Sequence, residues 1–153
     1  MIRRASAASR RGHRSSRGQT LVEFALVAPM FFLVLFSIVE GARFIFYYEM
    51  LNNATRDGAR YAIVHGENSF DPTGPPNDPS GADVITRVKQ SAVGIFGSSV
   101  TVTPTWTIAG VTAPNKRGTT VTVHAKYTYS TIIPIVPLPP ITVEAESTLV
   151  LNN

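Results

Sequence analysis

The sequence predicts an α+β protein in which a long N-terminal helix, transmembrane in its first half and amphipathic in its second, precedes one short helix and a small antiparallel β-sheet. Three observations lead to this fold class. An apolar run of membrane length lies near the N-terminus. Apolar residues then recur every three or four positions up to residue 65. Beyond residue 99 they recur at every second position, as in strands.

Residues 1–18 form a basic leader. The leader holds six of the 14 Lys and Arg residues and no acid, whereas the remainder carries eight basic and ten acidic residues, a net charge of −2. A short segment rich in Ser, Ala and Arg cannot bury a core, so we expect the leader to be disordered. The rest of the chain offers no concentrated basic patch, and we therefore expect no nucleic-acid partner.

The apolar run covers residues 21–39, in which Glu23 is the single charged residue. At 1.5 Å per residue it spans about 28 Å, close to the hydrocarbon thickness of a bilayer. The leader arginines precede it and the next arginine is Arg43, so the positive-inside rule predicts a single-pass protein of the inner (cytoplasmic) membrane, with a cytoplasmic N-terminus and an extracytoplasmic C-terminal domain. Pro29 predicts a kink in this helix.

A secretory signal peptide is the alternative for the same segment. It would be cleaved before Ala42, but the preceding residues lack the A-x-A pattern and the apolar run is long for a signal peptide. A permanent membrane anchor is therefore the favoured interpretation.

The helical pattern continues beyond the membrane segment and predicts one long helix over residues 19–65. Its apolar face is expected at Phe44, Tyr48, Leu51, Thr55, Ala59 and Ala62. Its polar face is expected at Glu49, Asn53, Arg56 and Arg60. Gly58 weakens the continuity of such a helix. We assign Arg43, Arg56 and Arg60 to contacts made by this outer half, which needs a surface to pack against.

Residues 66–81 are dense in Pro, Gly, Asn and Asp and predict a loop. Asp71, Asp78 and Asp83 offer the hard oxygen ligands that calcium prefers, but their spacing matches no calcium motif. Turn formation by these aspartates is therefore favoured, and calcium binding stays an open alternative.

Residues 82–153 are expected to contain one short amphipathic helix and a three-stranded antiparallel sheet. The apolar side of the helix is expected at Val84, Ile85, Val88, Ala92 and Ile95. The inward side chains of the strands are expected at Val100, Val102, Trp106 and Ile108, then at Val121, Val123, Ala125, Tyr127 and Tyr129, and finally at Ile141, Val143, Ala145, Leu149 and Leu151. Pro104 indicates a sheet edge or a bulge. The Pro-rich segment 132–141 predicts an extended connector, and the sheet is expected to cover the outer half of the long helix.

No catalytic pattern is present, so we expect no enzymatic activity, no small-molecule substrate, no cofactor and no metal site. His13, His65 and His124 have no neighbouring acid or serine in the arrangement of a triad or a metal site. There is no glycine-rich phosphate loop and no G-x-S-x-G motif. The chain contains no cysteine, which excludes disulfides and thiolate chemistry.

The order of features around Gly18 resembles the type IV pilin superfamily. A basic leader ends at Gly18, Glu23 is the fifth residue after it, and the apolar run follows. Within that superfamily, LVEFALVAPMFFLVLFSIVEGARF and the later ATRDGARYA resemble the TadE-like minor pilins, or pseudopilins, of tight-adherence (Flp-type) pilus systems. Pro29, six residues after Glu23, fits the TadE-like pattern better than that of ordinary type IV pilins. The strands match nothing specific.

The resemblance implies a pilin-like fold and cleavage by a prepilin peptidase between Gly18 and Gln19. It implies a membrane-anchored minor pilin that assembles with other pilins and with inner-membrane proteins of the Tad machinery, for surface attachment or secretion. Glu23 would pair with the new α-amino group of residue 19 in a neighbouring subunit and set the axial register. Gln19 departs from the phenylalanine usual in type IV pilins, and its cyclisation to pyroglutamate would remove that amine.

Two alternatives to this reading stay open. In the first, the chain is an uncleaved, permanently anchored binding module whose outer domain binds a partner, a polysaccharide or a surface. Trp106, Tyr127 and Tyr129 are then candidate contact residues, although core packing is favoured for them. In the second, Glu23 is an interfacial acid that reaches the lipid headgroups near the cytoplasmic end of the helix.

Overall fold

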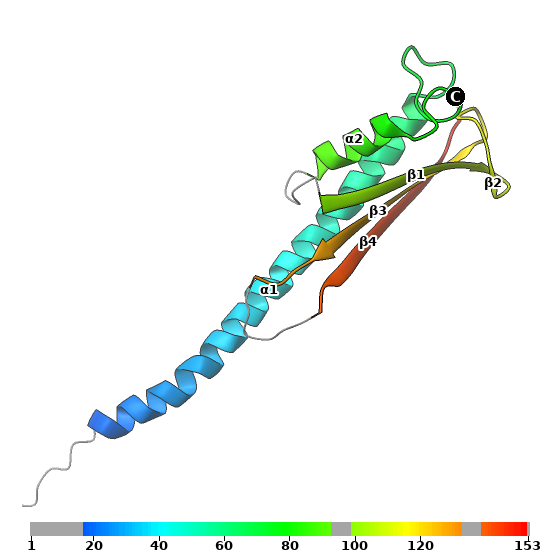
Figure 1. Cartoon of the computed structure of the whole chain (residues 1–153). Helices are drawn as coiled ribbons and strands as arrows, with labels where there is room; N and C mark the ends of the chain where they lie inside the picture. Colours follow the sequence, from blue (N-terminus) through cyan, green and yellow to red (C-terminus); the bar gives the residue numbers. More distant parts are fainter. Residues whose placement is uncertain (1–16, 93–98, 133–138, 153) are drawn as a thin grey trace, which may run out of the picture. The chain divides into compact units, whose positions relative to one another are not determined.

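The computed structural model describes residues 17–92, 99–132 and 139–152 (Figure 1). In these ranges the elements are α1 (Arg17–Val64), α2 (Ala82–Ser91), β1 (Val100–Ile108), β2 (Val111–Thr112), β3 (Thr120–Tyr129) and β4 (Ile141–Val150). The predicted fold class, a long apolar N-terminal helix followed by a short helix and an antiparallel sheet in a pilin-like α+β arrangement, is confirmed. The expected disorder of the leader concerns residues that lie outside the described ranges, except for Arg17 and Gly18.

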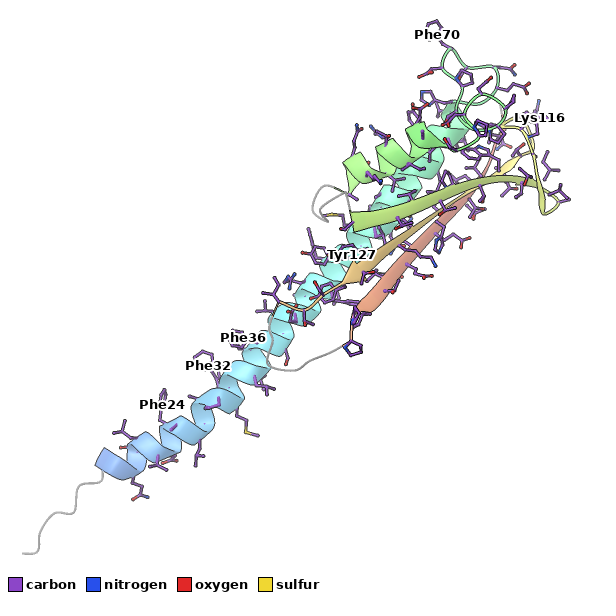
Figure 2. The ribbon with its side chains drawn as sticks, in the orientation of Figure 1. Phe24, Phe32, Phe36, Phe70, Lys116 and Tyr127 are labelled. Atoms are coloured by element: carbon purple, nitrogen blue, oxygen red, sulfur yellow. The ribbon has the colours of Figure 1, made fainter. Side chains whose placement is uncertain are left out.

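The chain divides into two compact units, and α1 contributes to both because the boundary falls between Ile38 and Val39. In the first unit the large apolar side chains of α1 are exposed, among them Phe24, Phe32 and Phe36 (Figure 2). The most apolar window of α1 has a mean hydropathy of 2.4 and no buried residue. By length and composition, α1 is long and apolar enough to cross a membrane once. Its first part is apolar on every side and has no buried face.

In the second unit, α1 has one buried face and one exposed face. Leu51, Ala59 and Ala62 are fully buried, as expected. The polar face is exposed, also as expected, at Glu49, Asn53, Arg56 and Arg60. Tyr48 is a correction: it is 44% exposed, and Tyr47 packs against the sheet instead. Both residues lie within one turn of Leu51, so helical spacing alone does not decide which of the two tyrosines packs on the core.

Gly58 lies where α2 approaches α1, and α1 runs through it without a break. A Cβ atom at Gly58 would lie 2.3 Å from Cγ2 of Val88, so only glycine permits this approach. On α2 the predicted positions Val84 and Val88 are buried, as is Ala92 just after it; Ile85 is half-buried, and Ile95 lies outside the described residues.

The sheet has four strands rather than three, all antiparallel, in the order β2-β1-β3-β4. The additional strand β2 has two residues and pairs with the end of β1 across a turn at Ala109 and Gly110, which both have positive φ. A strand of two residues is too short to show an alternating pattern. Pro104 lies on the part of β1 that β2 does not cover, at a sheet edge as predicted.

The inward side chains of the longer strands are mostly those expected, with two corrections. The buried ones are Val100, Val102, Trp106, Val121, Val123, Ala125, Tyr129, Val143, Ala145 and Leu151. Tyr127 and Leu149 are partly buried against this core. Ile108 and Ile141 are wrong as core residues, being 39% and 42% exposed. Each is the terminal residue of its strand, where the core no longer covers it. Most of the predicted connector, residues 133–138, lies outside the described ranges.

The core of the second unit lies between α1, α2 and one face of the sheet. It joins Leu51 and Ala54 of α1 to Val84 and Val88 of α2 and to the inward residues of β1, β3 and β4. The expectation that the sheet covers the outer half of the long helix is confirmed. The loop that precedes α2 contains turns and one isolated bridge, between Gly74 and Asp78.

Candidate functional site

The predicted processing residues lie in the first turn of α1. Gly18 and Gln19 are exposed, and among the described residues no side chain or distant backbone atom lies within 4 Å of the place that a Gly18 Cβ would take. Helix ends fray, and glycine weakens a helix by about 1 kcal/mol relative to alanine. Both effects favour local opening of the backbone at the Gly18–Gln19 peptide bond.

Glu23 follows Gln19 by one helical turn, and both side chains lie on one face of α1. With Gly18, Val22 and Leu26 they border an open, shallow hollow on the helix surface. Glu23 is exposed, and within the described part of the chain no basic group forms an ion pair with it. Its carboxylate is therefore directed outward, toward whatever surrounds the helix.

Pro29 lies inside α1 and is exposed. It has no N–H to donate to the carbonyl of Ala25, four residues earlier. The predicted kink at Pro29 stays a prediction.

A cluster that the sequence analysis missed surrounds Glu40, near the beginning of the second unit. We call Glu40, Arg43, Tyr129 and Ile132 the Glu40 cluster. The Glu40 carboxylate accepts hydrogen bonds from Arg43 Nη1 at 2.8 Å, from the Tyr129 hydroxyl and from the backbone N–H of Ile132 at 2.7 Å. Through these hydrogen bonds the cluster holds the end of β3, at Tyr129, and the following Ile132 against α1.

Aromatic rings cover the Glu40 cluster. Tyr129 is 3% exposed, and its ring centroid lies 5.6 Å from that of Phe44 and 5.7 Å from that of Tyr47. The Arg43 guanidinium carbon lies 5.6 Å from the centroids of both tyrosine rings, within the range of a cation–π contact. Burial, and then the hydrogen bond to Glu40, raises the pKa of Tyr129 to about 12.

The one sequence signal for the Glu40 cluster is the i, i+3 spacing of Glu40 and Arg43. Tyr129 and Ile132 follow Glu40 by 89 and 92 residues, and local spacing carries no information about them. The structure also separates the three arginines predicted to make outer-helix contacts. Arg43 belongs to the cluster, whereas Arg56 and Arg60 lie exposed on the polar face of α1.

A second polar contact joins α1 and α2. Asp57 Oδ2 lies 2.8 Å from Arg87 Nε and also accepts the hydroxyl of Ser91. The hydrogen bond from Ser91 is the main cause that lowers the pKa of Asp57, and Arg87 and Arg60 add to it.

The three aspartates considered as calcium ligands, Asp71, Asp78 and Asp83, are not grouped around one site in the described structure. Asp78 accepts hydrogen bonds from Ser80 Oγ at 2.8 Å and from Thr73 Oγ1 and the Asp83 N–H at 3.3 Å each, so it organises the turn before α2. Asp71 and Asp83 are exposed. Over residues 17–92, 99–132 and 139–152, no three His, Cys, Asp or Glu side chains are grouped to hold a metal.

The candidate contact residues of the binding-module alternative lie mainly in the core. Trp106 is 2% exposed and Tyr129 3%, so neither ring is available to a sugar or a surface. Tyr127 is half-buried against Tyr47, with ring centroids 5.6 Å apart. His65 stacks on Tyr61, and His124 lies 3.5 Å from Glu144 on the outer face of the sheet.

Comparison with known proteins gives one finding. The model of the family described as TadE-like protein matches residues 18–60, which include Gly18, Gln19, Glu23, Pro29 and all three predicted contact arginines. The resemblance to the TadE-like family is therefore confirmed over this part of α1, and the match includes none of the strands. No curated protein and no solved structure matches the chain.

Proposed function

We propose, from the premise that residues 18–60 match the TadE-like protein family, that the chain is a membrane-anchored minor pilin or pseudopilin. It contributes to the assembly of a Tad/Flp-type pilus or secretion apparatus, and its role is structural rather than enzymatic. Its partners are membrane lipid, a prepilin peptidase, other pilins and the inner-membrane assembly proteins of the Tad system. The observation that carries the proposal is Glu23, placed five residues after Gly18 on an exposed apolar helix.

Cleavage after Gly18 would give the carboxylate on this helix a partner. It creates an α-amino group at Gln19, and Glu23 of a neighbouring copy accepts it in an apolar environment. An unpaired acid costs about 2.5–3.5 kcal/mol at the centre of a membrane helix on insertion scales and less near the end, where Glu23 lies; pairing offsets part of that cost. A shift of one helical turn moves the two groups apart by about 5.4 Å, so the pair selects one axial register.

Gln19 adds a condition to this pairing. If the new N-terminus cyclises to pyroglutamate, the amine is lost and Glu23 requires another donor. The mass of the mature protein distinguishes the two forms, because cyclisation releases ammonia.

The test is the intact mass and N-terminal sequence of the protein isolated from the membrane of its own host. A start at Gln19, as the free amine or as pyroglutamate, supports the proposal. A start at Met1 contradicts cleavage and favours the permanently anchored binding module. The same measurement on a Gly18→Leu variant checks that the cut depends on the glycine.

A second experiment tests the role of Glu23 in assembly. Because Glu23 is exposed and lies outside the core of the second unit, Glu23→Ala is expected to leave that unit folded and to block incorporation into the filament or the basal complex. Glu49→Ala is the matched control, since Glu49 is an exposed acid on the polar face of α1. Normal incorporation of Glu23→Ala in a co-purification assay would contradict the assembly role.

A further inference from the structure

The two edges of the sheet differ in how they are closed. At the β1 edge, β2 pairs with the end of the strand, and Gly81, just before α2, lies against Pro104. At the other edge lies β4, a strand of ten residues that contains no proline and no lysine and pairs with β3 without a bulge (Figure 1). Short strands, prolines, bulges and charged side chains are the usual protection of a sheet edge. Of these, β4 has only two glutamates.

The register shows which backbone groups of β4 point to its free edge. The Leu151 N–H donates to the Thr119 carbonyl at 2.9 Å. In antiparallel strands, residue pairs that exchange hydrogen bonds alternate with pairs that do not. Continued along the register of β3 and β4, this alternation assigns the odd-numbered residues of β4 to hydrogen bonds with β3. The groups that point outward are therefore those of Thr142, Glu144, Glu146, Thr148 and Val150.

β1 supports the same assignment from the other side of β3. Val121 lies between Trp106 and Leu149, so if it bonds to Leu149, the groups of Trp106 must point away from β3. They do, because the Trp106 carbonyl accepts the Ala113 N–H at 3.0 Å. Pro104, which has no N–H, is also an even-numbered residue of β1, as expected at an edge. Within the described residues, no backbone group pairs with the outward groups of β4.

The outer face of β4 is negatively charged at this edge. Its even-numbered side chains are exposed, and they include both acids of the strand, which has no base. Glu144 pairs with Lys126 of β3, whose Nζ lies 3.0 Å from its carboxylate. Glu146 accepts the Thr148 hydroxyl at 3.4 Å and forms no ion pair within residues 17–92, 99–132 and 139–152. A basic side chain on a neighbouring strand would complement Glu146.

The inner face of β4 is apolar and incompletely covered. Val143 and Ala145 are buried, whereas Leu149 is half-buried and Ile141 is 42% exposed. A further strand with apolar residues on this face would cover the last two. Alternating basic and apolar residues would therefore match both faces of the edge.

The acids also argue against a second copy of β4 as the occupant. In an antiparallel pair of two β4 strands centred on Ala145, Glu144 of each copy lies opposite Glu146 of the other. In a pair centred on Glu146, that residue lies opposite itself. Like charges directly opposite each other destabilise a strand pair. The occupant is therefore a strand of different charge.

We propose that β4 binds an extended segment of a partner protein as an additional strand, and that this segment alternates basic and apolar residues. The outward N–H and C=O groups of β4 supply the hydrogen bonds, and Glu146 selects the basic side chains. This inference does not depend on Glu23 or on cleavage after Gly18, so it can fail or hold separately from the proposed function.

The test is amide hydrogen exchange, measured by NMR on the full chain in uncharged micelles, with and without a short peptide of alternating lysine and valine. In the free chain, Glu144 and Glu146 are expected to exchange at least about tenfold faster than Val143 and Ala145, which are bonded to β3. Saturating peptide should slow the first two at least about tenfold. Equal exchange of the two sets in the free chain, or no slowing with the peptide, would overturn the proposal.

Two further peptides separate strand pairing from charge attraction. A peptide of alternating glutamate and valine is expected to bind at least about tenfold more weakly, because its acids face Glu144 and Glu146. A peptide of the same lysines and valines, with the lysines grouped at one end, should not protect these amides, because its side chains do not alternate between the two faces. Equal protection by either control peptide would overturn the proposal.

Three variants sharpen the test. Thr148→Pro removes an outward N–H without removing a bond to β3, and should weaken the lysine–valine peptide at least about fivefold. Glu146→Gln, which leaves the backbone intact, should weaken it about threefold, as is typical of an exposed charge pair. Glu49→Gln, on the polar face of α1, is the matched control and should change nothing. Unchanged affinity of the Glu146→Gln variant would contradict the selection of basic side chains.

Discussion

In the first unit, up to Ile38, the apolar side chains of α1 are exposed on all sides, whereas in the second unit the same helix has a buried and an exposed face. Phe24 is 69% exposed and Phe36 37%, while Leu51 and Ala59 are fully buried. One continuous helix therefore meets two different requirements. Its first part needs an apolar environment supplied from outside the chain, and its second part carries its own core.

The hydrogen bonds of polar side chains also differ between the two units: local in the first and long-range in the second. In the first unit the Ser37 hydroxyl donates to the carbonyl of Leu33, one turn earlier, at 2.8 Å, as serine does on a helix without polar neighbours. In the second unit Glu40 and Asn115 each join segments more than 40 residues apart. The folding free energy of the second unit is thus internal to it, and under the proposed function changes in the first unit should act on membrane insertion and assembly instead.

Asn115→Leu is expected to have one of the largest effects. The substitution keeps the approximate volume but removes the side-chain donor from the carbonyls of Ala62, His65 and Thr73, of which His65 keeps the Thr73 N–H, and this loss should lower the free energy of unfolding by about 3 kcal/mol. Urea unfolding of the full chain in micelles, followed by Trp106 fluorescence, measures it. Asn53→Leu, on the exposed face of α1, is the control and should change the value by less than about 0.5 kcal/mol. Equal effects would contradict the internal role of Asn115.

Gly58→Ala and Gly41→Ala should have opposite signs. A methyl group at Gly58 meets the buried, stiff side chain of Val88 and should cost about 1–2 kcal/mol net. Nothing lies within 4 Å of a Cβ at Gly41, so alanine there should stabilise the helix by about 0.5–1 kcal/mol. Thermal unfolding followed by circular dichroism separates the two. A stabilising Gly58→Ala would show that α2 does not pack closely on α1.

The Glu40 cluster predicts a loss of stability at alkaline pH. The pKa of Tyr129 is raised from 10 to about 12, so its contribution is complete below pH 10 and is lost as the pH rises through about 12. The urea midpoint of the wild-type protein should therefore fall between pH 10 and pH 12. Tyr129→Phe removes this titration and should give a flatter curve over that window, although it starts from a lower stability. Parallel curves would contradict the raised pKa of Tyr129.

Phe32→Ala is expected to have the smallest effect on folding. Phe32 is 47% exposed and stacks on Phe36, with ring centroids 5.9 Å apart, and it makes no contribution to the core of the second unit. The unfolding free energy reported by Trp106 should change by less than about 0.5 kcal/mol. Leu51→Ala, at a buried position on the same helix, should cost about 2–5 kcal/mol in the same assay. Similar losses for both would abolish the distinction between the units.

Local pattern accounts for most of the elements. Alternation placed Val121, Val123 and Ala125 on the inward face of β3, and helical spacing placed Leu51 and Ala59 inward on α1. Two of the three errors fall where strands end: Ile108 and Ile141 continue the correct alternation but terminate their strands. The third, Tyr48, lies inside α1, where Tyr47 and Tyr48 both fit the helical spacing and only the packing distinguishes them.

The sequence by itself determined the apolar span, the spacing of Gly18 and Glu23, and the change from helical to strand periodicity, because each depends on residues close together in the chain. Only the tertiary structure decided the roles of Glu40, Gly58 and Asn115. The partners of Glu40 follow it by up to 92 residues, Val88 follows Gly58 by 30, and Asn115 donates to carbonyls that precede it by 42 to 53. Pairings over such separations depend on how the helices and the sheet pack together, and no local period in the sequence encodes them.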